Sequence, residues 1–403
     1  MPSVTRTTID AIEVSGRTVL VRVDFNVPIS DGVISDDSRI RAAIPTIQSI
    51  LDRGGSCVLM SHLGRPSGNG FESAFSLTPA AARLAELLGR PVNLPSADCL
   101  DDASRAAVAS IGSGEVILLE NLRFHADEKK GDVDFAARLA RYGDVYCQDA
   151  FGAAHRADAS MVAVPQAMEG RPRTAGRLLE AELRYLSGAI DSPERPFVAV
   201  LGGAKISDKL ATIRHLAGRV DTLVVGGAMA FTLLRAMGHD TGRSLVETSM
   251  IEEARAIIDA VDATATTLLL PVDFVCASAP AAGVETTVSG PDIESGLMGL
   301  DIGPASINAF SAAVRAARTV VWNGPMGLFE IPPFDQGTLA ITNAMIEATA
   351  AGATSVVGGG DTAAAVNDLG LGAGFTHVST GGGASLRMLE GGPMPGVDAL
   401  DLA

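Results

Sequence analysis

Short runs rich in β-branched and other apolar residues alternate with amphipathic stretches along almost the whole chain. Such alternation is typical of βαβ units, in which parallel strands lie beneath helices on both faces of a sheet. The sequence therefore predicts an α/β fold with parallel sheets. The expected strands are Thr18–Asp24, Ser56–Ser61, Val116–Glu120, Asp144–Ala150, Phe197–Leu201, Asp221–Val225, Thr267–Pro271, Thr319–Trp322, Ser355–Val357 and His377–Ser379.

A chain of 403 residues exceeds what one hydrophobic core usually organises, so we expect two domains. The turn-rich segment 171–176 separates the two halves of the pattern and leads into a predicted helix, Arg177–Ile190. Two further helices are predicted at Arg39–Arg53 and Thr78–Gly89. The expected divisions are a first domain at 1–173, a second at 174–389 that opens with an interdomain helix at 174–190, and an extended C-terminal tail at 390–403.

Charge and cysteine spacing exclude several classes of protein. The formal net charge is −16, whereas nucleic acids and anionic membranes attract basic proteins. No apolar stretch is long enough to span a membrane and no signal peptide is evident, so we expect a cytoplasmic protein. The cysteines form no CxxC pair, so their spacing signals neither a zinc site nor a redox motif, and we expect reduced core residues at Cys57, Cys99, Cys147 and Cys276.

Polar and basic residues follow the predicted strands of the first half. Ligands of open parallel sheets bind beyond the carboxyl ends of the strands, so these residues are candidates for a binding site. Arginine suits bidentate binding of carboxylate or phosphate, although a single arginine is more often a solvated surface cation. We expect the two histidines to orient a substrate and not to act as bases. The candidates are Asp24, Phe25, Asn26, Arg39, His62, Leu63, Gly64, Arg65, Arg123, His155 and Arg156.

Glycine-rich loops follow the strands of the second half instead. Glycine lets backbone N–H groups approach a phosphate, and a helix N-terminus adds partial positive charge, so a polyphosphate is expected there. Lys205 and Lys209 lie four residues apart, which predicts that they share one face at the start of one helix. Both ammonium groups could then reach the phosphates. Asp361 is placed to hold Mg²⁺. The loops are Gly202–Lys205, Gly226–Met229, Asn323–Pro325, Gly358–Thr362 and Gly381–Ser385.

These patterns alone indicate a phosphate-binding α/β protein and leave its chemistry open. The chain has no GxxxxGK[ST] loop, no GxGxxG followed by a ribose-binding acid, and no HRD triplet. An oxidoreductase with a bound dinucleotide is disfavoured by the missing GxGxxG and by the separate arginine cluster. A non-catalytic protein of the same fold is disfavoured because Arg39, Lys205, Lys209 and Asp361 are all present.

Ten motifs in the chain resemble those of phosphoglycerate kinases and occur in that family's order, covering residues 19–389. Four lie in the first half: VRVDFNVP (Val21–Pro28), SHLGRP (Ser61–Pro66), LLENLRF (Leu118–Phe124) and DAFGAAHRA (Asp149–Ala157). The other six are LGGAKISDK (Leu201–Lys209), VGGAMAFTLL (Val225–Leu234), MGLDIGP (Met298–Pro304), VWNGPMGLFE (Val321–Glu330), GGGDT (Gly358–Thr362) and STGGGAS (Ser379–Ser385).

The resemblance implies two Rossmann-like domains that face each other across a hinged cleft and close for phosphoryl transfer. It implies a monomer that binds 3-phosphoglycerate or 1,3-bisphosphoglycerate on the first domain and MgATP or MgADP on the second. By resemblance, the first-half candidates named above bind phosphoglycerate, and the catalytic residues are Arg39, Lys205 and Lys209. The residues implied for the nucleotide are Gly203, Lys205, Lys209, Gly227, Gly299, Asn323, Pro325, Glu330, Gly358, Gly359, Gly360, Asp361 and Thr362, with Asp361 also holding Mg²⁺.

Two residues depart from the family pattern. Ala228 stands where a third glycine is common, and it would slightly reshape the nucleotide pocket. Asp158 stands where a histidine or glutamine is usual. A carboxylate pointing inward would weaken anion binding, and we expect Asp158 to lie on the surface instead.

Overall fold

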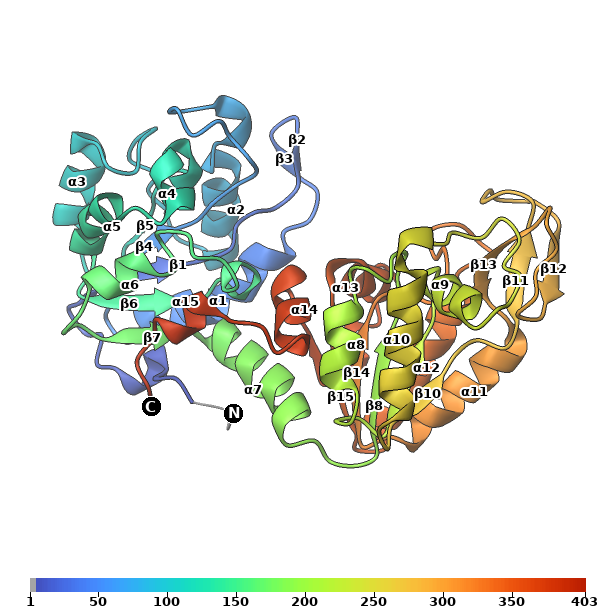
Figure 1. The fold of residues 1–403 in the computed structure, drawn as a ribbon. Coiled ribbons are helices and arrows are strands. Elements are labelled where there is room, and N and C mark those ends of the chain that lie inside the picture. Colours follow the sequence, from blue (N-terminus) through green and yellow to red (C-terminus); the bar gives the residue numbers. More distant parts are fainter. Residues whose placement is uncertain (1–4) are drawn as a thin grey trace. The chain divides into compact units, whose positions relative to one another are not determined.

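The computed structural model describes residues 5–403, which form two compact units (Figure 1). One unit comprises the chain up to Arg184 together with Pro393–Ala403, and the other comprises Tyr185–Gly392. The division falls inside helix α7 (Arg177–Asp191) and not at the predicted position 173/174. The last eleven residues belong to the first unit, whereas the sequence suggested a separate tail.

The first unit is built on a five-stranded sheet in the order β5-β4-β1-β6-β7, and all of its pairings are parallel. If the five strands of this sheet are renumbered 1 to 5 in chain order, their order across the sheet is 3-2-1-4-5. This is the order of the first five strands of a Rossmann fold. Strand β4 is completely buried, and β1 is buried except for Thr18, because helices cover both faces of the sheet. The strands are β1 (Thr18–Arg22), β4 (Ser56–Met60), β5 (Val116–Leu118), β6 (Val145–Gln148) and β7 (Arg173–Ala175).

Helices of the first unit bury apolar side chains such as Ile47, Leu84 and Leu139 against this sheet. A short antiparallel hairpin, β2 (Ile29–Ser30) with β3 (Val33–Ile34), follows β1. The helices are α1 (Ser38–Asp52), α2 (Thr78–Leu88), α3 (Asp102–Ala109), α4 (Ala126–Lys130), α5 (Val133–Leu139), α6 (Ala163–Ala167), the first part of α7 and α15 (Pro395–Asp398). Short 3₁₀ helices are η1 (Ile9–Ala11), η2 (Ser73–Phe75), η3 (Leu122–Phe124), η4 (Ala140–Tyr142) and η5 (Phe151–Ala153).

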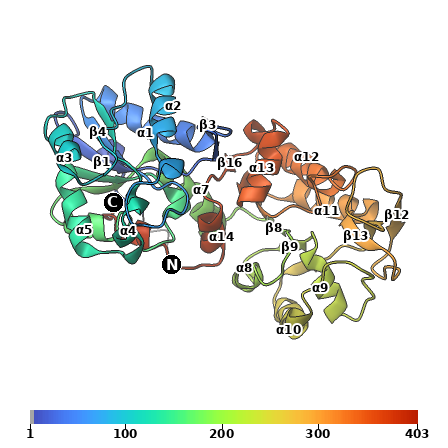
Figure 2. The same ribbon diagram turned by 90° about the horizontal axis from the view of Figure 1, so that it is seen from above.

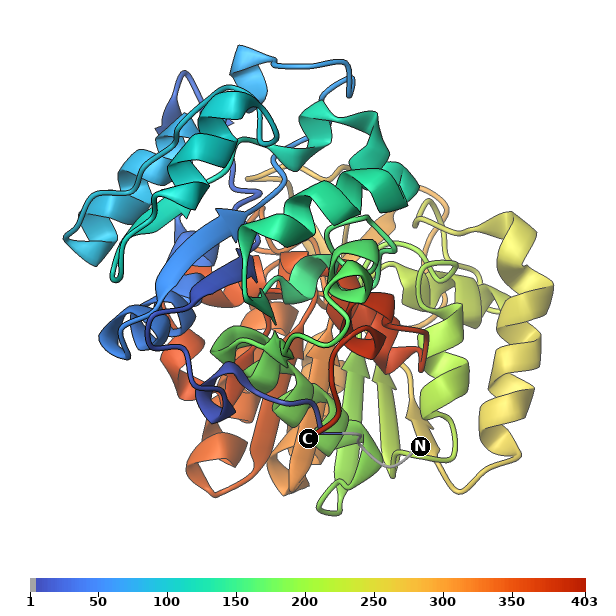
Figure 3. The ribbon, with the colours of Figure 1, turned by 90° about the vertical axis from the view of Figure 1, so that its left-hand side faces the viewer.

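The C-terminal segment is a packed part of the first unit and not an extended tail. Met394, Val397 and Leu400 are buried, and the backbone N–H of Gly396 donates to the carbonyl of Ala154 at 2.9 Å. The chain end then pairs with the N-terminal segment, since Thr7 N–H donates to the Asp401 carbonyl at 2.9 Å. In Figure 3 the red end of the ribbon accordingly runs beside the dark blue N-terminal part.

The second unit contains a six-stranded sheet in the order β10-β9-β8-β14-β15-β16, again with every pairing parallel. Its strands follow the full Rossmann order 3-2-1-4-5-6. Figure 2 shows α8, α9 and α10 on one side of this sheet and α11 and α12 on the other. The strands are β8 (Phe197–Leu201), β9 (Thr222–Val225), β10 (Thr267–Leu269), β14 (Thr319–Asn323), β15 (Thr354–Gly358) and β16 (His377–Val378).

A three-stranded antiparallel sheet adjoins this core and was not predicted from the sequence. It consists of β11 (Phe274–Ala277), β12 (Thr286–Ser289) and β13 (Met298–Ile302), and Phe274 packs there against Phe231. The remaining helices of the unit are α8 (Leu210–Leu216), α9 (Met229–Ala236), α10 (Ile251–Asp262), α11 (Pro304–Ala316), α12 (Gln336–Ala350), α13 (Gly360–Asp368) and α14 (Gly383–Leu389), with η6 (Thr248–Met250) and η7 (Gly372–Gly374).

The predicted fold class is therefore confirmed: two helix-covered parallel sheets occur in one chain. All ten predicted strands exist, with ends that differ from the prediction by at most two residues. None of the helices in residues 5–403 combines the length and apolar character that a membrane crossing requires. The four cysteines are free and buried, as expected.

Candidate functional site

In each unit the first three strands are added toward one edge of the sheet, and the fourth strand is added on the other side of the first. The strand order therefore reverses between the first and the fourth strand. In the first unit this switch point lies between β1 and β6, and in the second between β8 and β14. Loops that leave the two strands there diverge to opposite faces, which opens a crevice suited to a ligand. Most of the predicted site residues lie in loops at or beside these two points.

In the first unit, Arg39 at the start of α1 joins the loop that follows β1. Its guanidinium donates to the Asp24 carboxylate at 3.2 Å and to the Asn26 carbonyl at 3.1 Å. The Asn26 side chain in turn accepts from the backbone N–H of Gly64 at 2.8 Å. Two loops are thus held together by one arginine and one asparagine, and about a third of the Arg39 side chain stays exposed for a ligand.

His62 lies in the same network and is almost fully buried. Burial lowers its pKa well below the ordinary value, and Arg22, Arg123 and Arg156 lower it further. Burial also opposes ionisation of Asp24, but the nearby guanidinium groups of Arg39 and Arg22 outweigh it and keep the pKa of Asp24 below the ordinary value. The site therefore holds a neutral imidazole, an ionised carboxylate and several guanidinium groups at neutral pH, which suits binding of an anion.

Arg123 approaches the cluster from η3. It donates to the Gly64 carbonyl at 2.9 Å and forms an ion pair with Asp158 at 3.5 Å. The expectation that Asp158 lies on the surface is wrong, because it is 7% exposed and points at this arginine. A carboxylate paired with Arg123 competes with any anionic ligand for the same guanidinium.

The other predicted residues of the first unit fall into two groups. The side chains of Phe25 and Leu63 belong to the hydrophobic core, so only their backbones face the loops. Arg65 is exposed, while His155 and Arg156 are partly buried in the loop after η5. Arg156 is close enough to His62 and Arg123 to lower the pKa of both, which places it beside the cluster.

In the second unit, the loops after β8, β9 and β14 pack backbone against backbone. Gly203 N–H donates to the Pro325 carbonyl at 3.0 Å, and Gly227 N–H donates to the Met326 carbonyl at 3.1 Å. Gly227 has a φ of +67°, and a Cβ there would lie 2.6 Å from the nitrogen of Gly203. Only glycine fits at this position. Three of the predicted residues, Gly203, Gly227 and Pro325, are thus brought together.

Lys205 and Lys209 do not lie on one helix face, contrary to the sequence interpretation. Helix α8 begins at Leu210, with Lys209 as its N-cap and Lys205 in the loop that precedes it. Lys209 donates to the side-chain oxygen of Asn323 at the end of β14. Burial lowers the pKa of Lys209, while Asp208, Asp361 and Glu390 oppose that shift, so three carboxylates surround this ammonium.

The fourth glycine loop opens α13. Gly359, with a φ of +92°, is the N-cap, Gly358 ends β15, and Gly360 begins the helix. Asp361 is exposed in the first turn, and the Thr362 hydroxyl accepts from Gly324 N–H at 2.6 Å. The side-chain nitrogen of Asn323 is buried beside this loop without a partner in the described part of the chain. Backbone N–H groups, an amide, a lysine and a carboxylate therefore gather at one helix N-terminus.

Two predicted nucleotide residues lie further out in the second unit. Gly299 is in β13, where a Cβ would collide with the Phe231 ring. Glu330 is exposed in a turn after β14. Neither residue takes part in the hydrogen bonds that join the glycine loops to Lys209 and Asn323.

A search against protein-family models matches residues 9–392 to "Phosphoglycerate kinase". The chain belongs to the phosphoglycerate kinase family. Curated phosphoglycerate kinases of Rhodopirellula baltica and Chloroherpeton thalassium are 50% and 49% identical to it, and each alignment covers 98% of this chain and 99% of the relative. Among solved structures, the Coxiella burnetii enzyme of the family matches with a TM-score of 0.89 at 36% identity, and the Pyrococcus horikoshii enzyme with 0.84 at 31%. Each comparison covers 98% of both chains.

Arg22 was not among the residues that the phosphoglycerate kinase motifs singled out for a role. It is fully buried at the end of β1, where its Nε donates to the Ser160 hydroxyl at 2.8 Å and its terminal Nη2 lies 3.1 Å from Nδ1 of His62. This contact between Arg22 and His62 helps to fix the orientation of the His62 ring. The sequence analysis gave Arg22 no role because it lies within a predicted strand, whereas site candidates were sought among the residues that follow strands.

Proposed function

We propose that this chain catalyses reversible transfer of the acyl phosphate of 1,3-bisphosphoglycerate to MgADP, giving 3-phosphoglycerate and MgATP in glycolysis and gluconeogenesis. It is then a phosphotransferase with a carboxyl group as acceptor. The observation that carries the proposal is the presence of two different anion-receptive sites at two Rossmann switch points. One is a cluster of arginines around Asn26 and His62, and the other is a set of glycine loops with two lysines.

This reaction needs no general base, which agrees with sites built mainly from positive and N–H donor groups. In the direction of ATP consumption the nucleophile is a carboxylate, which is already ionised at neutral pH. No proton has to be removed, and the neutral, buried His62 is suited to orienting the substrate. What remains is to hold two anions near each other and to stabilise charge on the transferring phosphoryl group, which calls for guanidinium, ammonium and backbone N–H donors.

We assign the phosphoglycerate to Arg39, Asn26, Arg65, Arg123 and Arg156, with Asp24 and His62 fixing their orientation. On the second unit, Lys209 and Asn323 bind nucleotide phosphates with the N–H groups of the loop Gly358–Thr362. Arg39 and Lys205 stabilise the transferring phosphoryl group. Gly203, Gly227, Gly299, Pro325 and Glu330 line the adenine and ribose region.

Mg²⁺ fits the second site through Asp361. Magnesium in nucleotide sites is typically held by one or two carboxylates together with substrate phosphates and water, and not by a cage of protein ligands. Asp361 supplies one exposed carboxylate at the helix N-terminus that would bind the phosphates. When bound, the ion would offset the negative charge of the phosphates. We further propose that the enzyme acts in the cytoplasm as a monomer, without a nucleic acid or membrane partner.

A coupled assay of ATP-dependent 3-phosphoglycerate turnover tests the proposal in wild type, Arg39→Ala and Asp361→Ala, with and without Mg²⁺. We expect turnover that requires Mg²⁺ and falls by at least a hundredfold in both variants, since each removes charge stabilisation from the transfer step. Arg90→Ala is a matched control, because Arg90 is bound to the Gly114 carbonyl away from both sites and its loss should change turnover less than twofold. A folded wild type that binds nucleotide but shows no turnover would refute the proposal and favour a non-catalytic protein.

A further inference from the structure

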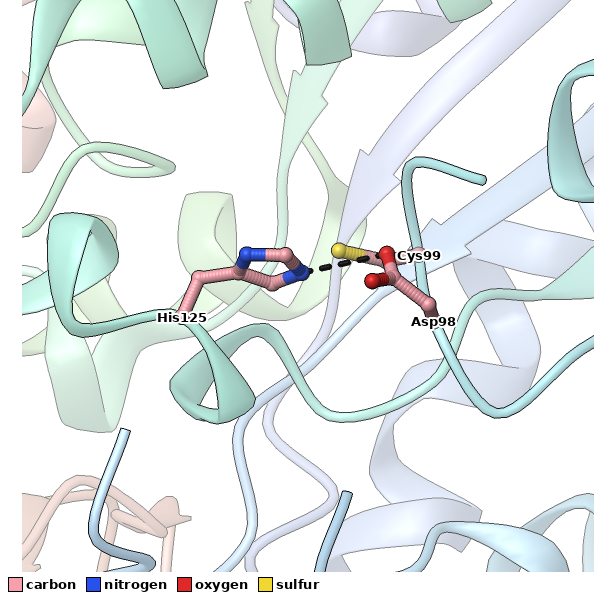
Figure 4. A group of neighbouring side chains, drawn as sticks. All are labelled: Asp98, Cys99 and His125. Atoms are coloured by element: carbon pink, nitrogen blue, oxygen red, sulfur yellow. Dashed lines mark hydrogen bonds and ion pairs between the residues drawn. The ribbon is translucent and has the colours of Figure 1, made fainter. Parts of the chain in front are cut away.

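Three side chains with metal-binding atoms converge in the first unit, apart from the arginine cluster. Asp98 and Cys99 lie in the turn before α3, and His125 follows η3 (Figure 4). One ligand atom of each side chain lies within 4.8 Å of the other two. Among residues 5–403 this is the one group of three or more histidine, cysteine or carboxylate side chains with such proximity. Figure 4 shows the imidazole nitrogen pointing at both the carboxylate and the sulfur.

The three atoms form a mixed nitrogen, sulfur and oxygen set. His125 Nε2 lies 3.1 Å from Asp98 Oδ1, a separation close to that of two ligands on one tetrahedral zinc ion, which is on the order of 3.5 Å. Thiolate and imidazole together favour Zn²⁺ or a similar borderline-soft ion, whereas Mg²⁺ and Ca²⁺ prefer oxygen ligands only. The donor set therefore differs in kind from the single carboxylate of Asp361.

We propose that Asp98, Cys99 and His125 bind one zinc ion, with water in the fourth position. Coordination breaks the S–H bond of Cys99, forms the zinc–sulfur bond and releases the proton to solvent. The hydrogen bond between Asp98 and His125 is then replaced by a bond from each side chain to the ion.

Solvent access and local rigidity both suit such a site. Cys99 is 1% exposed, whereas the side chains of His125 and Asp98 are 24% and 46% exposed, so an ion can enter from the side of these two. The turn is held in place because the Leu100 carbonyl accepts from two arginines and Leu100 N–H donates to Asp98 at 2.7 Å. The His125 ring also packs on Phe135, with ring centroids 5.2 Å apart. Preorganised ligands lose little freedom on binding.

The site connects two segments of the first unit that differ in role. His125 lies two residues after Arg123, which we assigned to phosphoglycerate, and the turn at Asp98 leads into α3. A bound ion would tie the η3 loop to this turn and stabilise the first unit against unfolding. The ion would therefore link these two segments while keeping one coordination position open to water.

Cobalt titration of the chelator-treated, full-length protein tests the proposal, because Co²⁺ replaces zinc and reports its ligands by absorption. We expect one equivalent to produce a thiolate-to-cobalt charge-transfer band in the near ultraviolet and the strong visible bands of a tetrahedral ion. Zn²⁺ should displace the cobalt stoichiometrically and raise the melting temperature. Asp98→Asn and His125→Gln should weaken binding at least tenfold, and Cys99→Ala should abolish the charge-transfer band.

Two control variants separate this site from others. Cys276→Ala removes a buried cysteine of the second unit and should leave the spectrum unchanged. Asp361→Ala should also leave it unchanged, since an oxygen-only site gives no sulfur band. Variants are compared only after circular dichroism shows a native fold. A wild type without the charge-transfer band, or a band that persists in Cys99→Ala, would overturn the proposal.

Discussion

The ion pair between Arg123 and Asp158 sets a limit on how strongly the first site attracts an anion. The pair is nearly buried, so its two charges are poorly screened by solvent. A phosphate or carboxylate that binds Arg123 must displace or share the Asp158 carboxylate. We therefore expect Asp158 to compete with an anionic substrate for Arg123.

We predict that Asp158→Asn lowers the KM for 3-phosphoglycerate severalfold and leaves the KM for ATP unchanged. The asparagine keeps the size of the side chain but releases the Arg123 charge for the ligand. Steady-state kinetics with each substrate varied in turn measures both values. Glu169→Gln, which neutralises an exposed carboxylate of the same unit, controls for the change in net charge. A rise in the KM for 3-phosphoglycerate would mean that Asp158 instead holds Arg123 in its binding position.

Residue types after strands predicted which polar and basic residues of the first unit lie together, because the carboxyl ends of parallel strands meet at one edge of the sheet. The same reasoning could not find Arg22 or the orientation of Asp158. Both depend on contacts between segments that are far apart in sequence, such as Arg22 with Ser160. The zinc ligands were missed for the same reason, since His125 is 26 residues from Cys99 and no spacing rule links them.

At the scale of elements, the junction of the loops after β8, β9 and β14 depends on glycine. We predict that Gly227→Ala raises the KM for ATP at least tenfold and destabilises the second unit by more than about 1 kcal/mol, because the methyl group meets the Gly203 backbone and the positive φ is strained. Nucleotide titration by calorimetry and thermal unfolding measure the two effects.

Gly238→Ala is the matched control for this change. Gly238 has a φ of +99°, but a Cβ there meets no atom within 4 Å. Gly238→Ala should add a similar backbone strain, and so lower stability, without any effect on nucleotide binding. Equal nucleotide affinities in the two variants would contradict the role given to the glycine junction.

The N-terminus of α7 is capped by a buried carboxylate. Asp149 accepts from the N–H groups of Leu178 and Leu179 at 3.0 and 3.2 Å. Burial nevertheless raises its pKa from 3.8 to about 7, because desolvation outweighs these hydrogen bonds. The folded protein therefore keeps a proton on Asp149 over a pH range in which the unfolded chain has lost it.

This shift predicts a loss of stability with rising pH. Between about pH 4 and pH 7 the folded state binds the extra proton, so the free energy of unfolding falls as pH rises and levels off above about 7. At about 1.4 kcal/mol per pKa unit, the loss is on the order of a few kcal/mol. Asp149→Asn cannot titrate, so its melting temperature should decline less than that of wild type from pH 5 to pH 8. Asp134→Asn, at an exposed carboxylate, should follow the wild-type profile. Parallel profiles for wild type and Asp149→Asn would refute the assignment.

Strands buried on both faces were predictable because their apolar runs are bounded by polar loops, and Phe197–Leu201 matches the predicted bounds at both ends. The antiparallel strands β11 to β13 were not predicted. Thr286–Ser289 is largely exposed and polar, so it has no apolar run to mark it. The start of α8 was also placed too early, because the four-residue spacing of two lysines satisfies a turn as well as a helix.

For the whole molecule, the packed C-terminal segment makes the first unit depend on both ends of the chain. We predict that Leu400→Ala lowers the melting temperature of the first unit by several degrees, since a buried leucine contributes roughly 2–5 kcal/mol. Deleting residues 393–403 should have a larger effect. The deletion should also raise the KM for 3-phosphoglycerate more than that for ATP, because Gly396 contacts Ala154, next to His155.

Leu402→Ala is the control for the single substitution, as Leu402 is 62% exposed near the same chain end. Thermal unfolding followed by calorimetry, with and without each substrate, assigns the transition to a unit. If the deletion shifted both KM values equally, the segment would not act through the first unit alone.

The pairing of Thr7 with Asp401 means that the first unit is the first to be started and the last to be finished when the chain is made. Its opening 184 residues leave the ribosome well before Pro393 is added, whereas all of the second unit, Tyr185–Gly392, is present by then. During translation the first unit therefore exposes the apolar surface that Val397 and Leu400 will cover until the whole of the second unit has been synthesised. Nascent chains arrested before Pro393 should therefore be the form that chaperones recognise.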